Sequence, residues 1–269
     1  MSYLVSLFLL FSFSPKTPAV DTPFALTSSP TNLLIQENEL SEVRRLDSAG
    51  RGPDGKLPQL SALEHLRRGS IYLANRAFRE AREHFQALIE RYPNDFNVPS
   101  ALYGIGRSYF QMRGYEESVP YFERLVRDFP QTKDGREGLY SLASAFLRLG
   151  RASEAAARYA EYTTKYPSGE KIDFAYLNVI DSLREAGRSG EAIPWIERTR
   201  ERFAGTAVAT NALFARLRLD VASGDWQHAI QTADQLRATP FSKKVATSPD
   251  EVLYLKAYSL EHAGRREEA

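Results

Sequence analysis

The residues that could do metal or acid–base chemistry are few and far apart in this sequence. The four histidines are separated from one another by at least 19 residues, and no HExxH-like cluster is present: His65, His84, His228 and His262. Metal sites on a helix use histidines three to five residues apart. The sequence therefore predicts no metal site, no cofactor and no histidine-based catalyst.

Neighbouring acidic residues are common, but their pattern is that of a solvated helix surface. Glu116 and Glu117 are adjacent, and Glu123 lies four residues before Arg127. Such spacing gives ion pairs between successive helical turns. No Gly-rich phosphate loop and no Gly-x-Ser-x-Gly motif occurs. We therefore expect no catalytic residues and no enzymatic activity from this chain.

Composition excludes several further classes of function. The chain has no cysteine, which excludes disulfides, thiolate metal sites, a cysteine nucleophile and a lipid-modified N-terminal cysteine. Its 35 Lys and Arg residues balance 34 Asp and Glu residues, for a net charge of +1. Binding to nucleic acid or to an anionic membrane calls for a clearly basic face. We therefore expect neither kind of partner.

The chain is organised around a repeat of 37 residues that begins near residue 61. The clearest copies pair a small residue with a ring four residues later and close on proline, as in Ala81, Phe85 and Pro93. Glycines that could end the first helix of later copies recur at Gly150, Gly187, Gly224 and Gly264. This period predicts helix pairs stacked in a solenoid. The first helices are expected at 61–75, 99–112, 137–149, 173–186, 210–223 and 249–263.

These residues resemble the tetratricopeptide repeat, which has small residues at positions 8 and 20, aromatics at 11 and 24, and proline at 32. Gly69, Tyr72, Ala81, Phe85 and Pro93 fill these positions in the first copy. The resemblance implies an all-α, right-handed solenoid of antiparallel helix pairs. About five and a half repeats are expected over 61–269, cut within the sixth. The 37-residue period and Tyr-Pro endings are similar to those of bacterial cell-envelope members.

Later copies depart from the pattern. Position 8 holds Ile180 in the fourth copy and Leu217 in the fifth, and position 11 of the fifth holds Asp220. On the same register, His84 and His228 are expected at the surface of second helices. His65 is expected in the packing, and His262 near the concave groove.

The resemblance also implies a concave groove lined by positions 5 and 9 of the first helices, which would hold an extended peptide or a partner helix. Tyr103, Tyr140 and Tyr254 are expected to expose their rings there, whereas Phe214 could face the groove or pack. Beyond Leu66 and Ser70 of the first copy, the predicted groove residues are Tyr103, Arg107, Tyr140, Ser144, Leu177, Asp181, Phe214, Arg218, Tyr254 and Tyr258.

The N-terminal region has the pattern of a signal peptide followed by a linker. Residues 3–13 form an apolar run too short to span a bilayer, and Thr17-Pro18-Ala19 offers small residues at a cleavage site. We expect a signal peptide at 1–19, although Met1-Ser2 carries no basic residue, and no membrane span in the mature chain. Residues 20–60 are predicted to be a Pro-, Ser- and Gly-rich linker, with a short helix at 32–46 that caps the first repeat.

Three functions remain open. The first is a non-enzymatic scaffold in the bacterial periplasm or cell envelope, or a secreted one, that binds protein or peptide and could serve the cell-wall machinery. The second is the N-terminal superhelix of a soluble lytic murein transglycosylase, since the degenerate later repeats resemble that arrangement. The catalytic Glu-Ser pair followed by Gly-Leu-Met-Gln is missing; the one Glu-Ser is Glu117-Ser118, where Ser118 is a packing position. The third is a cytosolic assembly module, if residues 1–19 are not a signal.

Overall fold

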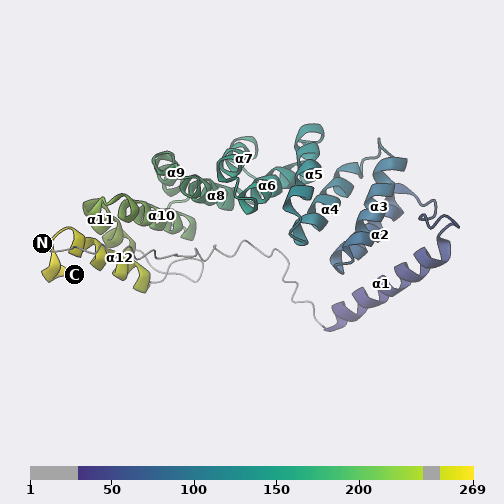
Figure 1. Ribbon diagram of the computed structural model, residues 1–269, viewed down its shortest axis with the longest axis horizontal. Coiled ribbons are helices and arrows are strands. Elements are labelled where there is room, and N and C mark those ends of the chain that lie inside the picture. Colours follow the sequence, from purple (N-terminus) through teal and green to yellow (C-terminus); the bar gives the residue numbers. More distant parts are fainter. Residues whose placement is uncertain (1–29, 239–248) are drawn as a thin grey trace, which may run out of the picture.

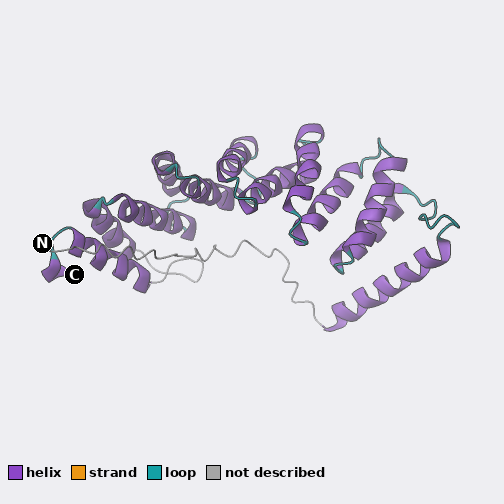
Figure 2. Ribbon diagram, viewed as in Figure 1, coloured by secondary structure: helices purple, strands orange, loops and turns teal. Residues whose placement is uncertain are grey.

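The protein folds as a chain of helices without strands over the residues that the structure, a computed structural model, describes: 30–238 and 249–269 (Figures 1 and 2). The predicted signal peptide and Pro240 lie outside these residues. A short 3-10 helix, Arg266–Glu268, follows the last α-helix. The α-helices are α1 Pro30–Gly50, α2 Ala62–Ala74, α3 Phe78–Arg91, α4 Val98–Gln111, α5 Tyr115–Asp128, α6 Lys133–Arg148, α7 Ala152–Lys165, α8 Ile172–Glu185, α9 Ser189–Arg202, α10 Ala207–Ser223, α11 Trp226–Arg237 and α12 Pro249–His262.

Each helix packs against its neighbours in sequence, and the assembly curves into an arch with α2 near one end and α12 at the other (Figure 1). First helices of successive repeats also touch, as α4 touches α6. The predicted all-α solenoid is confirmed, and the observed first helices lie within a few residues of the predicted ranges. No helix in 30–238 or 249–269 is long and apolar enough to cross a membrane.

The packing within a repeat depends on one aromatic ring wedged against glycine. The Phe85 ring of α3 lies between Gly69 of α2 and Gly104 of α4, and a Cβ at Gly69 would come 2.6 Å from Phe85 Cε1. The next repeat copies this arrangement with Gly106 and Phe122, at the same 2.6 Å. Only a residue without a side chain lets the ring lie so close to the helix axis. The expected packing role of positions 8 and 24 is therefore confirmed.

The turn after each first helix requires a left-handed residue. The four glycines predicted to end these helices have φ between 71° and 80°: Gly150, Gly187, Gly224 and Gly264. In the first two repeats the same turn is made by Arg76 (φ 60°) and Arg113 (φ 64°), which the sequence did not reveal. The left-handed conformation costs an L-residue roughly 1–2 kcal/mol. Packing on both sides of these turns must offset that cost.

The degenerate fifth repeat keeps its packing by other means. Leu217 is fully buried at position 8. Asp220, at the position usually occupied by an aromatic, is buried and accepts hydrogen bonds from Arg216 Nε (2.7 Å) and Thr232 Oγ1 (3.2 Å). A polar cluster here replaces the ring.

Helix α1 covers the outer side of the first repeat. It is longer at both ends than the predicted helix at 32–46. Its Val43 and Asp47 are buried, and Leu40 packs against the core. Helix α1 thus covers part of the first repeat through Leu40, Val43 and Asp47.

Over-packing at position 20 should destabilise the solenoid. Ala155 of α7 is fully buried, so Ala155→Leu is expected to lower the free energy of unfolding by about 1–3 kcal/mol. The matched control is Ala157→Leu on the exposed side of the same helix, which should change it by less than about 0.5 kcal/mol. Urea unfolding followed by circular dichroism measures both, and equal effects would refute the assigned packing role.

Candidate functional site: the concave groove

The predicted groove residues lie on the first helices α4, α6, α8, α10 and α12, where positions 5 and 9 are one helical turn apart. Tyr103 of α4 is half-buried, with its ring 6.0 Å from that of Phe122. Arg107, the next residue on this face, is also half-buried. Both side chains therefore keep part of their surface open to a ligand.

Tyr140 of α6 is held firmly. Its ring meets those of Tyr159 and Tyr162 edge-on, at 5.2 and 5.7 Å. Its hydroxyl accepts a hydrogen bond of 2.8 Å from Asn178 Nδ2 of α8, and Lys171 Nζ lies 4.7 Å from the ring centre. This half-buried ring is a rigid part of the groove wall that also links two repeats.

Two charged residues follow along the groove. Asp181 of α8 pairs with Arg184 at 3.5 Å and keeps 34% of its side chain exposed. Burial among the surrounding groove walls raises the pKa of Asp181, although Arg184 and Arg218 act in the opposite direction. Arg218 of α10 pairs with Glu251 of α12 at 2.6 Å. The groove thus carries both signs of charge near its middle.

The most exposed part of the groove is on α12. Tyr254 is 62% exposed, and Tyr258 lies beside it with its ring centre 6.3 Å away. Tyr258 in turn contacts His262 at 4.1 Å, and Trp226 of α11 packs against His262 at 4.9 Å. His262 thus lies beside Tyr258, one of the predicted groove residues. Trp226 was missed because it belongs to a second helix.

Three predicted groove residues need comment. Ser144 is only 8% exposed, and its hydroxyl bonds to Tyr159 Oη at 2.8 Å. Ser144 is therefore a packing residue, and its assignment to the groove was wrong. Phe214 is 5% exposed and lies under the Arg218 guanidinium at 4.4 Å, so its ring packs. Leu177 is half-buried against the core.

The fold brings two histidines together that are 19 residues apart in sequence. His65 Nδ1 of α2 lies 3.1 Å from His84 Nδ1 of α3, and His84 Nε2 lies 2.9 Å from Asp47 Oδ2 of α1. His65 packs as predicted, but His84 was wrongly expected at the surface, since it is 1% exposed. Helix α1 covers a side of α3 that would otherwise be open. His228 is exposed, as expected.

The hydrogen bonds of this cluster define the protonation of both rings. Arg91 Nη1 lies 3.4 Å from His65 Nε2 and can only donate. His65 then carries its proton on Nδ1 and donates to His84 Nδ1, which leaves His84 to donate from Nε2 to Asp47. Burial lowers the pKa of His65 to about 4 and also lowers the pKa of His84. Both rings are neutral near pH 7.

Asp47 is the centre of the cluster. Its carboxylate also accepts hydrogen bonds from Tyr72 Oη at 2.7 Å and Arg68 Nη1 at 2.5 Å. Burial acts to raise the pKa of Asp47, but the hydrogen bonds from Tyr72, His84 and Arg68 outweigh it and the pKa lies below its usual value. No water-accessible face remains for substrate, so the cluster holds α1 in place. No group of three or more His, Cys, Asp or Glu side chains in 30–238 or 249–269 is arranged so that it could hold a metal ion.

Comparison with known proteins agrees with this geometry. Residues 65–95 and 103–170 each match a tetratricopeptide repeat family. These segments are thus similar to tetratricopeptide repeats. No curated protein sequence matches the chain. The tetratricopeptide repeat family is typically non-catalytic.

Solved structures share the fold at low sequence identity. "MamA AMB-1" is 17% identical, with a TM-score of 0.50 over 65% of this chain and 86% of its own. A putative kinesin light chain of Podosopora anserina with nearly identical TPR-like repeats is 15% identical, with a TM-score of 0.51 over 65% and 92%. PilW, a type IV pilus biogenesis factor, is 15% identical, with a TM-score of 0.50 over 77% and 87%. At these identities the likeness concerns the fold alone.

The histidine cluster should make the protein acid-sensitive. Histidine has a pKa of about 6.5 in an unfolded chain, whereas His65 has a pKa of about 4 and that of His84 is also lowered. As the pH falls, the two histidines therefore bind protons at a higher pH in the unfolded chain than in the folded protein. The histidine contribution to stability is complete above about pH 6.5 and falls as the pH drops towards about 4.

Melting temperatures between pH 7 and pH 4.5 test this expectation. Wild type should lose several degrees over this range, because each pKa unit corresponds to about 1.4 kcal/mol. His65→Gln should show a shallower loss, and His228→Gln, at an exposed histidine, should follow the wild type. A melting temperature that is flat across the range would show that folding does not lower the pKa of the two rings.

Proposed function

We propose that this chain is a non-enzymatic scaffold of the bacterial cell envelope, exported to the periplasm, that binds an extended peptide or helix of a partner in its concave groove. One observation carries the binding claim. Tyr103 of α4 and Tyr140 of α6 are half-buried and Tyr254 of α12 is exposed, all at the same position of their repeats. Partly exposed tyrosines give large contact area with little loss of side-chain entropy, and they are enriched at binding hot spots.

The charges of the groove indicate the kind of partner. Arg107 and Arg218 stand on either side of Asp181 along the groove. The Arg218–Glu251 and Asp181–Arg184 pairs lie across or beside this path. A segment with apolar side chains and charges of both signs would match this surface better than a uniformly acidic or basic one.

Two features support export. Residues 3–13 have the length and composition of a signal-peptide core, and the chain lacks cysteine. The fold is shared with PilW, a type IV pilus biogenesis factor.

A role beside the cell-wall machinery, as the superhelix of a transglycosylase-like protein, is the less favoured reading. In this chain Ser118 is fully buried, and its hydroxyl donates to the Tyr115 carbonyl at 2.7 Å, so the Glu117-Ser118 pair cannot serve as a catalytic pair.

Groove binding can be tested with a photo-reactive phenylalanine analogue placed at Tyr103 or Tyr254 in cells. Both positions should form cross-links to the same partner. Phe96, which is 85% exposed in the turn between α3 and α4, is the matched control and should not. For the partner segment so identified, Tyr103→Ala with Tyr254→Ala should weaken binding at least about tenfold, the loss typical of one hot spot or more.

Isothermal titration calorimetry measures this loss, and circular dichroism checks that the helices remain. Cross-links at Phe96 but at neither groove position would contradict the assignment of the groove. So would unchanged affinity in the double alanine variant.

Export can be tested separately by expressing the complete sequence in a Gram-negative host. We expect the protein in the periplasmic fraction with Val20 as its first residue, because cleavage is expected after Ala19. N-terminal sequencing of the purified protein measures this. Soluble cytoplasmic protein that still begins at Met1 would refute export and favour a cytosolic assembly module.

A further inference from the structure

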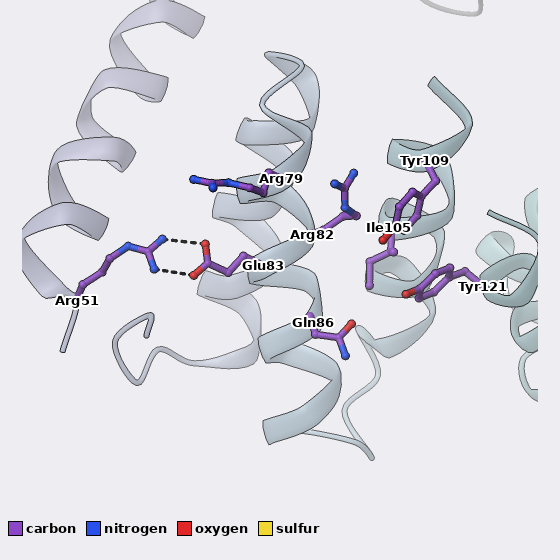
Figure 3. Close-up of a pocket in the computed structure, with 8 residues that line it drawn as sticks. All are labelled: Arg51, Arg79, Arg82, Glu83, Gln86, Ile105, Tyr109 and Tyr121. Atoms are coloured by element: carbon purple, nitrogen blue, oxygen red, sulfur yellow. Dashed lines mark hydrogen bonds and ion pairs between the residues drawn. The ribbon is translucent and has the colours of Figure 1, made fainter. Parts of the chain in front are cut away.

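A second candidate site lies away from the concave groove. It is a pocket of about 580 Å³, and its lining residues are Arg51, Arg79, Arg82, Glu83, Gln86, Ile105, Tyr109 and Tyr121 (Figure 3). Ile105 and Tyr109 are roughly 200–240° around α4 from the groove residue Tyr103 at 100° per residue. The pocket therefore opens on the opposite side of the solenoid from the groove, and we call it the arginine pocket.

Helix α3 provides the centre of the arginine pocket. Arg79, Arg82, Glu83 and Gln86 follow one another at the spacing of one helix face, and Figure 3 shows them along the same side of α3. The lining of the pocket includes three arginines and one glutamate, so it has an excess of two positive charges. Arg51 pairs with Glu83 through two hydrogen bonds of 2.6 and 2.8 Å. Glu83 is thus hydrogen-bonded to Arg51, and the N–H groups of Arg79 and Arg82 are not used in that pair.

Arg82 is held in position by its neighbours. Its Nη1 donates to Ser108 Oγ at 3.2 Å, and its guanidinium stacks on Tyr109 at 4.3 Å from the ring centre. Tyr109 stacks in turn on Tyr121, 5.9 Å away. These contacts leave other N–H groups of Arg82 for a ligand, in a rigid setting that reduces the entropy lost on binding.

The arginines of this cluster do not recur at the same positions in the other repeats. At intervals of 37 residues after Arg79 the chain has Glu116, Ser153, Gly190 and Gln227. At the same intervals after Arg82 it has Val119, Ala156, Ile193 and Ile230. None of these is basic, although all five repeats fold alike. The two arginines are therefore not needed to build a repeat.

We propose that the arginine pocket is a second docking site, which takes a short acidic segment of a partner protein. The carboxylates would pair with Arg79 and Arg82, as guanidinium groups favour, and an apolar side chain would lie on the Tyr109 and Tyr121 rings. The pocket is open to solvent, and its volume is within the range of ligand pockets. A lipid surface fits less well, because binding to anionic lipid uses clusters of four or more basic residues. This inference rests on the chain being a protein-binding module but not on its groove.

The test uses a fluorescent peptide, Gly-Glu-Glu-Leu-Glu-Gly, capped at both ends, and a matched peptide with Gln in place of every Glu. Fluorescence anisotropy with the full chain should show binding of the acidic peptide alone, weakened by added salt. Arg79→Glu should reduce the affinity at least tenfold, and Arg82→Gln should do the same. Because Arg82 contributes to packing, the Arg79 variant keeps the test valid if the other fails to fold.

The control is Arg124→Gln with Arg127→Gln on α5. These residues pair with Asp128 outside the pocket, and their loss should change the affinity less than twofold. An equal loss in this control would overturn the proposal in favour of non-specific attraction. Absence of peptide binding, with Arg79-dependent binding to phosphatidylglycerol vesicles, would overturn it in favour of lipid headgroups.

The proposals for the groove and for the arginine pocket can be refuted independently of each other. Tyr103→Ala with Tyr254→Ala should leave binding of the acidic peptide unchanged. Loss of that binding in the groove variant, with none in Arg79→Glu, would place the acidic peptide in the groove and overturn the pocket proposal.

Discussion

The first two repeats depend on one packing constraint, an aromatic ring in the space left by a missing side chain. Phe85 fills the gap between Gly69 and Gly104, and Phe122 repeats this against Gly106. Helices of the solenoid contact their neighbours in the chain, and first helices also contact those of the next repeat. Stability is then roughly a sum of local terms, and every repeat needs something to cover its outer side. That need explains α1, whose Val43 and Asp47 are buried against the first repeat.

Helix α1 is attached to the first repeat through a buried carboxylate, that of Asp47. Asp47 accepts hydrogen bonds from Arg68, Tyr72 and His84, and all four residues are buried. A buried ion pair contributes little net stability, because desolvation offsets much of the attraction, but removal of one partner costs about 3–5 kcal/mol. The cluster therefore specifies where α1 sits more than it strengthens the fold. It also makes the protein sensitive to protonation of two histidines.

Because packing is confined to a few positions of the repeat, the remaining surface is free to differ between copies. The proposed groove contains such variable positions, among them Tyr103, Asp181 and Arg218. The arginine pocket contains others on the opposite side, where Arg79 and Arg82 have no basic counterparts in later repeats. A scaffold with two separate faces could hold two partners, or two parts of one partner, at a defined distance.

The sequence by itself determined the fold, since residues that pack helix on helix recur every 37 positions. Gly150 and Gly187 likewise predicted their turns, because only φ above zero closes them. The sequence did not reveal that Arg76 and Arg113 make the same turn, because arginine carries no preference for it. Only tertiary structure brought His65 to His84 and both to Asp47, through contacts between helices that follow no repeat. It also decided that Ser144 and Phe214 are covered while Tyr254 is open, since exposure depends on what the neighbouring helices place above each residue.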